Sequence, residues 1–231
     1  MKLARFIVVV FMLCLSVSFA VDFTPPSGTF DISSAVPDVV ITANTMTVKD
    51  GLATLTGNVK ATRATDVLTC NKAIVSKEPS WMLASLTPHL FRRETLLEQK
   101  LIRELNLEAK NIFVNETLGT FSASDSVYLR IDENSWDLAT TSWSVITSDE
   151  MLGFKDSERM IFSGNVRIIE QDTNGKGNRL DLIKSRNLAI LSGRAYLETK
   201  EFDEKTGKKE MRILRGNKII YNTETKQATS K

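Results

Sequence analysis

The 231-residue sequence has little of what metal sites and disulfide frameworks require. It contains one histidine, His89, and two cysteines, Cys14 and Cys70. One histidine excludes a histidine-based metal cluster, and a single cysteine in the mature chain excludes a Cys₂His₂ or Cys₄ zinc site. If Cys14 is removed with an N-terminal signal, Cys70 has no partner within the chain, and apolar burial and backbone pairing must hold the fold together. We expect Cys70 to be a buried apolar residue, and we expect no metal and no cofactor.

Recognisable catalytic motifs are also missing. The sequence has no G-x-S-x-G elbow, no P-loop and no dinucleotide fingerprint. A glycoside hydrolase needs only two carboxylates, but none of the 28 Asp and Glu residues stands out as such a pair. The sequence therefore predicts that the protein is not an enzyme.

An apolar run from Phe6 to Ala20 follows Lys2 and Arg5. It is shorter than the roughly 20 residues that cross a bilayer, and small residues near its end are typical of a signal-peptide cleavage site. We expect residues 1–20 to be a cleaved signal peptide, with retention as a membrane anchor as the alternative. Cleavage leaves 28 basic and 28 acidic residues. A neutral mature chain predicts no nucleic-acid partner.

Alternating apolar and polar residues begin near residue 39, after a proline-containing stretch that we interpret as a flexible leader over residues 21–38. Three segments, 53–61, 160–168 and 189–197, alternate as half-buried antiparallel strands do. Each has a glycine in phase with its apolar residues: Gly57, Gly164 and Gly193. We expect these glycines to point inward and, because they have no side chain, to let the strand bulge and to leave room for another backbone or for an acyl chain. The alternative is that they relieve crowding where the sheets coil.

A second pattern begins at residues 41, 68, 107 and 214. Each copy has an apolar residue, a small residue two positions later, an apolar residue three positions after that, and Val or Tyr two further on. The alternation therefore slips once within each strand, as a β-bulge or a switch between sheets would produce. Together with the first pattern, this predicts an all-β antiparallel fold of many short strands.

Turn residues indicate hairpins at Asp50-Gly51, at Asn174-Gly175 and within residues 203–210. One segment departs from the strand pattern. Thr87-Pro88 is typical of a helix start, and the leucines that follow lie on one face of a helix ending near Asn106. We therefore expect a helical insertion over residues 79–106 that covers an open end of the sheets. Docking of a partner through Leu90, Leu97, Leu101 and Leu105 is the alternative.

The segments ITANTMTVKDGLATLTGNV, Ile41 to Val59, and SERMIFSGNVRIIEQDTNGKGNRLDL, Ser157 to Leu182, are similar to the LptA/OstA family of periplasmic lipopolysaccharide-transport proteins. The resemblance covers residues 39–75 and about 107–228. It implies an elongated, twisted β-jellyroll over residues 39–228, open like a V, followed by a short tail at 229–231. It also implies a periplasmic protein of outer-membrane biogenesis whose apolar interior holds the acyl chains of lipopolysaccharide or a related glycolipid.

The residues that the resemblance assigns to lipid binding are the inward apolar positions. They are Ile41, Ala43, Leu55, Val59, Leu68, Phe162, Val166, Ile168, Leu180, Leu191 and Leu197. An open jellyroll has free strand edges, and these favour strand addition by another chain. We expect the edges at Val40, Ile41, Ile219, Ile220 and Tyr221 to bind inner-membrane LptC-like and outer-membrane LptD-like jellyroll partners, or a second copy end to end.

Two alternatives remain. If the N-terminal segment is retained, the same fold would be a membrane-tethered, LptC-like subunit. A jellyroll that binds or hydrolyses carbohydrate would instead present exposed aromatic residues along a groove. Trp136 and Trp143 are close enough to suggest such a platform, but they differ by seven positions and so face opposite sides of an uninterrupted strand.

Overall fold

A computed structural model describes residues 32–33, 39–76, 78–97, 100–136, 141–203, 208–222 and 227–231. These residues form strands and one short 3₁₀ helix. The elements are β1 (Ile32–Ser33), β2 (Val39–Thr42), β3 (Thr45–Lys49), β4 (Leu52–Arg63), β5 (Asp66–Ser76), β6 (Trp81–Ser85), β7 (His89–Leu96), β8 (Leu101–Glu108), β9 (Asn111–Asn115), β10 (Thr120–Ser135), β11 (Thr141–Phe154), β12 (Arg159–Glu170), β13 (Thr173–Ile183), η3 (Lys184–Arg186), β14 (Leu188–Asp203), β15 (Lys208–Asn222) and β16 (Ala228–Ser230). Within this part of the chain, no helix is long and apolar enough to cross a membrane.

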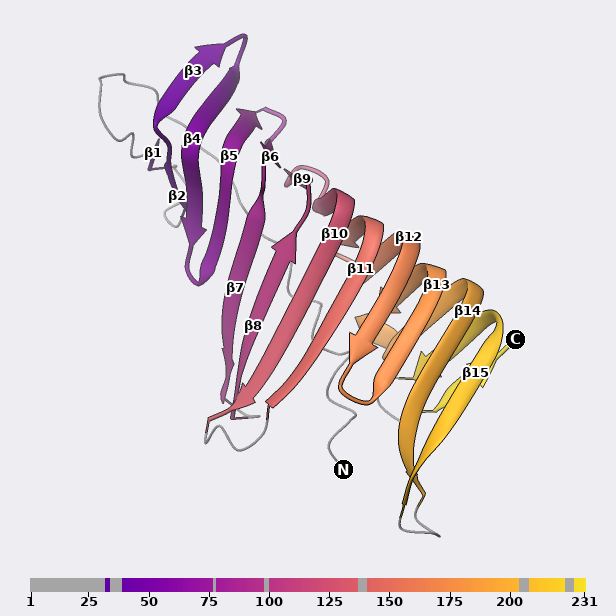
Figure 1. Cartoon of the computed structure of the whole chain (residues 1–231). Helices are drawn as coiled ribbons and strands as arrows, with labels where there is room; N and C mark the ends of the chain where they lie inside the picture. Colours follow the sequence, from indigo (N-terminus) through magenta and orange to yellow (C-terminus); the bar gives the residue numbers. More distant parts are fainter. Residues whose placement is uncertain are drawn as a thin grey trace.

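All the strands belong to one antiparallel sheet, in which neighbours along the chain mostly pair with one another. Figure 1 shows the strands stacked along one axis, from β2 and β3 at the N-terminal end to β15 at the C-terminal end. Each strand pairs only with its neighbours in the stack, so the fold is an elongated, coiled β-jellyroll. The all-β prediction is confirmed.

A bend near the middle of each strand divides the sheet into two arms. Register shifts mark the bend in successive strand pairs, for example between Thr56 and Val59 and between Ser163 and Val166. We call the two halves arm A and arm B. Arm A contains the strands β3, β6, β9 and β16 and one half of each long strand: residues 52–56, 72–76, 120–124, 150–154, 159–163, 179–183, 188–192 and 218–222. Arm B contains the strands β2, β7 and β8 and the other halves: residues 59–63, 66–70, 127–135, 141–148, 166–170, 173–177, 195–203 and 208–216.

The bends have a repeated local geometry. On alternate strands two consecutive residues have positive φ, and the neighbouring strand opposes them with a single residue. The positive-φ pairs are at residues 57–58, 86–87, 125–126, 164–165 and 193–194. A two-against-one arrangement is a β-bulge, and it shifts the alternation on the opposing strand by one residue. The slip expected in the segments that begin at 41, 68, 107 and 214 is confirmed.

The bend glycines differ from the sequence-based expectation. Gly164 has a φ of +75°, and a Cβ there would lie 2.8 Å from the Asp149 Cβ. At Gly57 a Cβ would lie 2.7 Å from the Asn44 Nδ2. Asn44 and Asp149 are exposed residues at the bend. The glycines are therefore needed for a left-handed backbone pressed against a neighbouring strand. The expectation that they let the strand bulge is confirmed, whereas the expectation that they point inward was wrong.

The expected helical insertion is absent: residues 89–96 and 101–108 form the hairpin β7–β8. Leu90, Leu101 and Leu105 are buried, but Leu97 is 69% exposed. Spacings of four residues fit both a helical face and one face of a strand, and the alternation of Leu101, Arg103, Leu105 and Leu107 decides for a strand. The hairpin is part of the sheet and does not lie over its end.

The three turn predictions have different outcomes. Asp50 and Gly51 have positive φ and join β3 to β4, so this hairpin is confirmed. Asn174 and Gly175 lie inside β13, and the turn falls at residues 171–172, because Glu170 pairs with Thr173. The tip expected within residues 203–210 joins β14 to β15, although residues 204–207 lie outside the described residues, as does the expected signal peptide.

Candidate lipid-binding interior

The inner face of arm A is apolar from the bend to the outer end of the strands. Two complete rows of directly opposed residues cross it. The row nearer the bend holds Leu55, Ala73, Ala84, Ile112, Ala123, Met151, Phe162, Leu180, Leu191 and Ile219, and all ten are buried. The outer row, from Ala53 to Ala228, also has only apolar residues or glycine.

Arm B begins with a similar apolar row and then becomes polar. The apolar row contains Leu68, Leu90, Leu107, Leu129, Ile146, Ile168, Gly175, Leu197 and Leu214. Side chains of both arms belong to one continuous hydrophobic core. Farther from the bend, the inner positions of arm B hold charged and hydroxyl residues together with the buried Leu101, Leu105 and Ile131. The interior is therefore apolar at its centre and polar along one margin.

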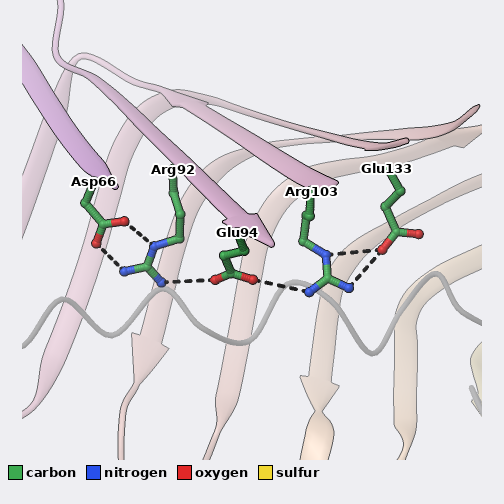
Figure 2. Close-up of polar contacts among 5 residues, drawn as sticks. All are labelled: Asp66, Arg92, Glu94, Arg103 and Glu133. Carbon is green, nitrogen blue, oxygen red and sulfur yellow. Dashed lines mark hydrogen bonds and ion pairs between the residues drawn. The ribbon is translucent and has the colours of Figure 1, made fainter. Parts of the chain in front are cut away.

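Five charged residues form the part of this margin that we call the rim ladder: Asp66, Arg92, Glu94, Arg103 and Glu133 (Figure 2). Arg92 donates two hydrogen bonds to the Asp66 carboxylate, one of them from Nε to Oδ1 at 2.6 Å. Glu94 lies between the two arginines, with its Oε2 3.3 Å from the Arg103 Nη1. Arg103 donates from Nε and Nη2 to the Glu133 Oε1, at 3.1 and 2.9 Å.

The rim ladder lies inside the fold. Asp66, Arg103 and Glu133 are each less than 10% exposed. Buried charges are costly unless opposite charges and hydrogen bonds compensate them. The sequence places these residues inward because they keep the phase of their apolar neighbours, as Arg103 does with Leu101 and Leu105. The ladder crosses β5, β7, β8 and β10 and so joins the β7–β8 hairpin to the rest of arm B.

The polar margin continues across the C-terminal strands with mostly uncharged groups. Ser144, Glu170, Thr173, Thr199 and Arg212 oppose one another in register on β11 to β15. The hydroxyls of Thr173 and Thr199 are 3.1 Å apart. Burial disfavours the charged form of Glu170 and raises its pKa from the usual 4.5 to about 8. Glu170 is therefore largely protonated near neutral pH.

The structure brings the predicted lipid-binding residues together on the inner faces of the two arms. Leu55, Phe162, Leu180 and Leu191 lie in one row of arm A, and Leu68, Ile168 and Leu197 lie in one row of arm B. Val59 and Val166 follow the bends of β4 and β12, and Ile41 and Ala43 are buried at the N-terminal end. Ile168 is partly buried, and the others are buried. That they bind lipid remains a prediction.

Sequence reasoning missed much of the interior. The missed inner residues include Met82, Phe121, Leu129, Ile131, Met151 and the rim ladder. The alternation of Val127, Leu129 and Ile131 was a usable signal, and its continuation places Glu133 inward. Cys70 is buried as expected, and burial raises the pKa of its thiol.

The predicted edge residues are paired within the chain. Val40 and Ile41 pair with β1 on one side and β4 on the other. Ile219, Ile220 and Tyr221 pair with β14 and with β16, so the expected tail at 229–231 is mostly strand, and the edge assigned to these residues was wrong. Among the described residues, β3 pairs only with β4, and residues 208–216 of β15 pair only with β14. Within the described residues, the open edges are therefore β3 and the three-residue β16 in arm A, and the two-residue β1 and residues 208–216 of β15 in arm B.

The fold and its interior define an elongated antiparallel β-jellyroll protein with a continuous apolar core. Among solved structures, the chain is similar to LptH of Pseudomonas aeruginosa, described as the LptA homologous periplasmic component of the conserved lipopolysaccharide transport device. The two chains share 10% identity with a TM-score of 0.28, and the match covers 83% of this chain and 80% of that chain. No family model and no curated protein matches the chain.

Proposed function

We propose that the protein is a periplasmic carrier that holds the acyl chains of lipopolysaccharide or a related glycolipid between its two arms and passes them toward the outer membrane. The observation that carries this proposal is the interior: apolar rows run through every strand pair from the N-terminal to the C-terminal end, and a polar margin borders them on arm B. An amphiphile has the same division into an apolar body and a polar head.

The energetics favour a carrier with such an interior. Transfer of one methylene out of water contributes roughly 0.8 kcal/mol, so an acyl chain of about a dozen carbons gains on the order of 10 kcal/mol in an apolar site. The inner side chains are already buried against one another. Lipid entry therefore requires the arms to separate, and the bends at which single residues oppose positive-φ pairs are where we expect this movement.

Transfer along a chain of carriers requires contacts between jellyrolls. We propose that β3 and residues 208–216 of β15, at opposite ends of the stack, add strands from LptC-like and LptD-like partners or from a second copy. Both segments present backbone N–H and C=O groups on their outer side. The same edges would serve a membrane-tethered LptC-like subunit, which N-terminal sequencing of the exported protein would distinguish from a free carrier.

Site-specific photo-cross-linking tests the interior. A photoreactive phenylalanine analogue replaces Phe162, which is fully buried on the inner face of β12. The matched control replaces Phe154, which occupies an outward position on the neighbouring strand β11. We expect lipopolysaccharide to be captured at position 162 and little or none at position 154.

Equal capture at both positions, or capture only at position 154, would show that lipid does not enter between the arms. Mass spectrometry of lipids that copurify with the unmodified protein identifies the ligand independently of the cross-linker. A protein that copurifies with no multi-acyl lipid and captures none would contradict the carrier function itself.

A further inference from the structure

The outer face of arm B carries a row of cations on its C-terminal strands. Arg167, Lys176, Tyr196 and Arg215 oppose one another directly on β12, β13, β14 and β15. The Lys176 Nζ and the Arg215 Cζ lie 5.2 and 5.5 Å from the centroid of the Tyr196 ring, on which they form cation–π contacts. All three cations are exposed. Adjacent strands are about 4.8 Å apart, so the row is a compact strip of positive charge.

Exposed apolar side chains lie beside this row on the same outer face. Ile169 and Ile213 occupy the next outward positions on β12 and β15, and they are 40% and 47% exposed. Met211, which pairs with exposed Lys200, is 57% exposed. We call these residues the basic face: Arg167, Ile169, Lys176, Tyr196, Lys200, Met211, Ile213 and Arg215. The basic face therefore exposes two kinds of surface to solvent, positive charge and large apolar side chains.

The N-terminal part of arm B has no such surface. There the exposed arginines lie beside carboxylates: Arg93 pairs with Glu104, and Arg130 with Asp132. Among the described residues, the basic face has two carboxylates beside it: Glu198 accepts a hydrogen bond from the Tyr196 hydroxyl at 2.7 Å, and Asp172 lies opposite Lys200, whose backbone N–H donates to the Asp172 carbonyl oxygen at 2.9 Å. The sequence has the same asymmetry. Residues 159–222 contain 14 Lys and Arg against 8 Asp and Glu, whereas residues 39–158 contain 12 against 16.

We propose that the basic face binds the surface of an anionic phospholipid bilayer. The cations would contact lipid phosphates, and each would strengthen binding to an anionic surface several-fold. Tyr196, with an apolar ring and a polar hydroxyl, is suited to the interface. Ile169, Met211 and Ile213 would enter the headgroup region. The apolar residues favour a membrane over an acidic protein. This inference goes beyond the proposed carrier function, because it requires no lipid between the arms.

Vesicle flotation tests the basic face. The full chain is mixed with phosphatidylcholine vesicles, with or without phosphatidylglycerol, at low and high salt. We expect binding only to vesicles that contain phosphatidylglycerol, with strong weakening by salt. The double variant Lys176→Glu/Arg215→Glu should bind these vesicles more weakly by a factor of roughly ten or more. Its matched control is Lys60→Glu/Lys72→Glu, which makes the same charge change at outward positions of β4 and β5.

The apolar contribution is tested separately. Ile213→Ser should weaken vesicle binding several-fold, whereas Val40→Ser, at a residue 41% exposed at the other end of arm B, should leave it unchanged. Circular dichroism confirms that each variant is folded. Three results would overturn the proposal: no vesicle binding, equal binding to neutral and anionic vesicles, or equal losses in the two charge-reversal variants. Lipid capture at Phe162 remains a separate measurement, so failure here leaves the carrier function standing.

Discussion

Arm A and arm B are built from the same polypeptide segments, yet their inner margins differ. In arm A the outermost inner row is apolar, and residues such as Met82, Phe121 and Leu182 reach the end of the strands. In arm B the corresponding positions hold the rim ladder and the hydroxyls of Ser144 and Thr199, with the apolar Leu105 and Ile131 between them. The pairing is continuous through both arms, so side chains alone set the difference. We infer that arm A provides most of the apolar core and that arm B forms the polar margin.

The variant with the largest expected effect on this comparison removes Arg103, the central cation of the rim ladder. Arg103→Met leaves Glu133, only 4% exposed, without its cation, and also takes a partner from Glu94. Loss of one partner from a buried ion pair costs about 3–5 kcal/mol. We expect the free energy of unfolding, measured by urea denaturation, to fall by that amount.

Arg130→Met is the matched control. Its pair with Asp132 is on the outer face, and the Arg130 side chain is 45% exposed. Exposed ion pairs contribute about 0–1 kcal/mol, so this variant should be nearly as stable as the parent. Similar small losses in both variants would mean that the rim ladder is solvated and that arm B has no buried margin.

A second test concerns the bends that separate the arms. Gly164→Ala places a Cβ on a residue with a φ of +75°, 2.8 Å from the Asp149 Cβ. A left-handed alanine costs roughly 1–2 kcal/mol, and moving Asp149 also disturbs its 2.9 Å hydrogen bond from the Asn165 Nδ2. We expect a loss of about 2–3 kcal/mol in urea denaturation.

Gly51→Ala separates backbone strain from crowding. Gly51 has a φ of +77°, but a Cβ there meets nothing within 4 Å. It should cost only the left-handed conformation, roughly 1–2 kcal/mol. If the two alanine variants were equally stable, the close contact at the bend would contribute nothing, and the arms would be free to change their relative angle there.

The sequence predicted the strands of this fold and the slip at their bends better than the β7–β8 hairpin and the polar margin. Alternation through Leu55, Val59, Phe162 and Val166 identified inner positions, because a half-buried strand must repeat every two residues. The apolar pattern did not distinguish a helix from a β-hairpin over residues 87–106, because leucines four residues apart lie on one face of either a helix or a strand. The rim ladder could not be derived from the sequence, because charged residues at inward positions become reasonable only once their partners are known: Asp66 opposes Arg92 on one strand pair, and Arg103 opposes Glu133 on another.

The smallest expected effect tests whether the polar margin of arm B extends to its C-terminal strands. Burial raises the pKa of Glu170 to about 8. The folded protein therefore holds this proton more tightly than the unfolded chain does. The contribution of Glu170 to stability should be greatest at acidic pH, fall as the pH rises from about 4.5 to about 8, and level off above that.

Glu170→Gln keeps the neutral shape and removes the titration. One pKa unit corresponds to about 1.4 kcal/mol, and because Glu170 keeps some exposure, we expect a gain of about 1–2 kcal/mol at pH 8 and almost none at pH 4. Urea denaturation at both pH values measures this difference. Glu108→Gln, at an exposed position of β8, should have the same free energy of unfolding as the parent protein at each pH. If Glu170→Gln also had the same free energy of unfolding as the parent protein at both pH values, Glu170 would be hydrated, and the buried polar margin would end at the rim ladder.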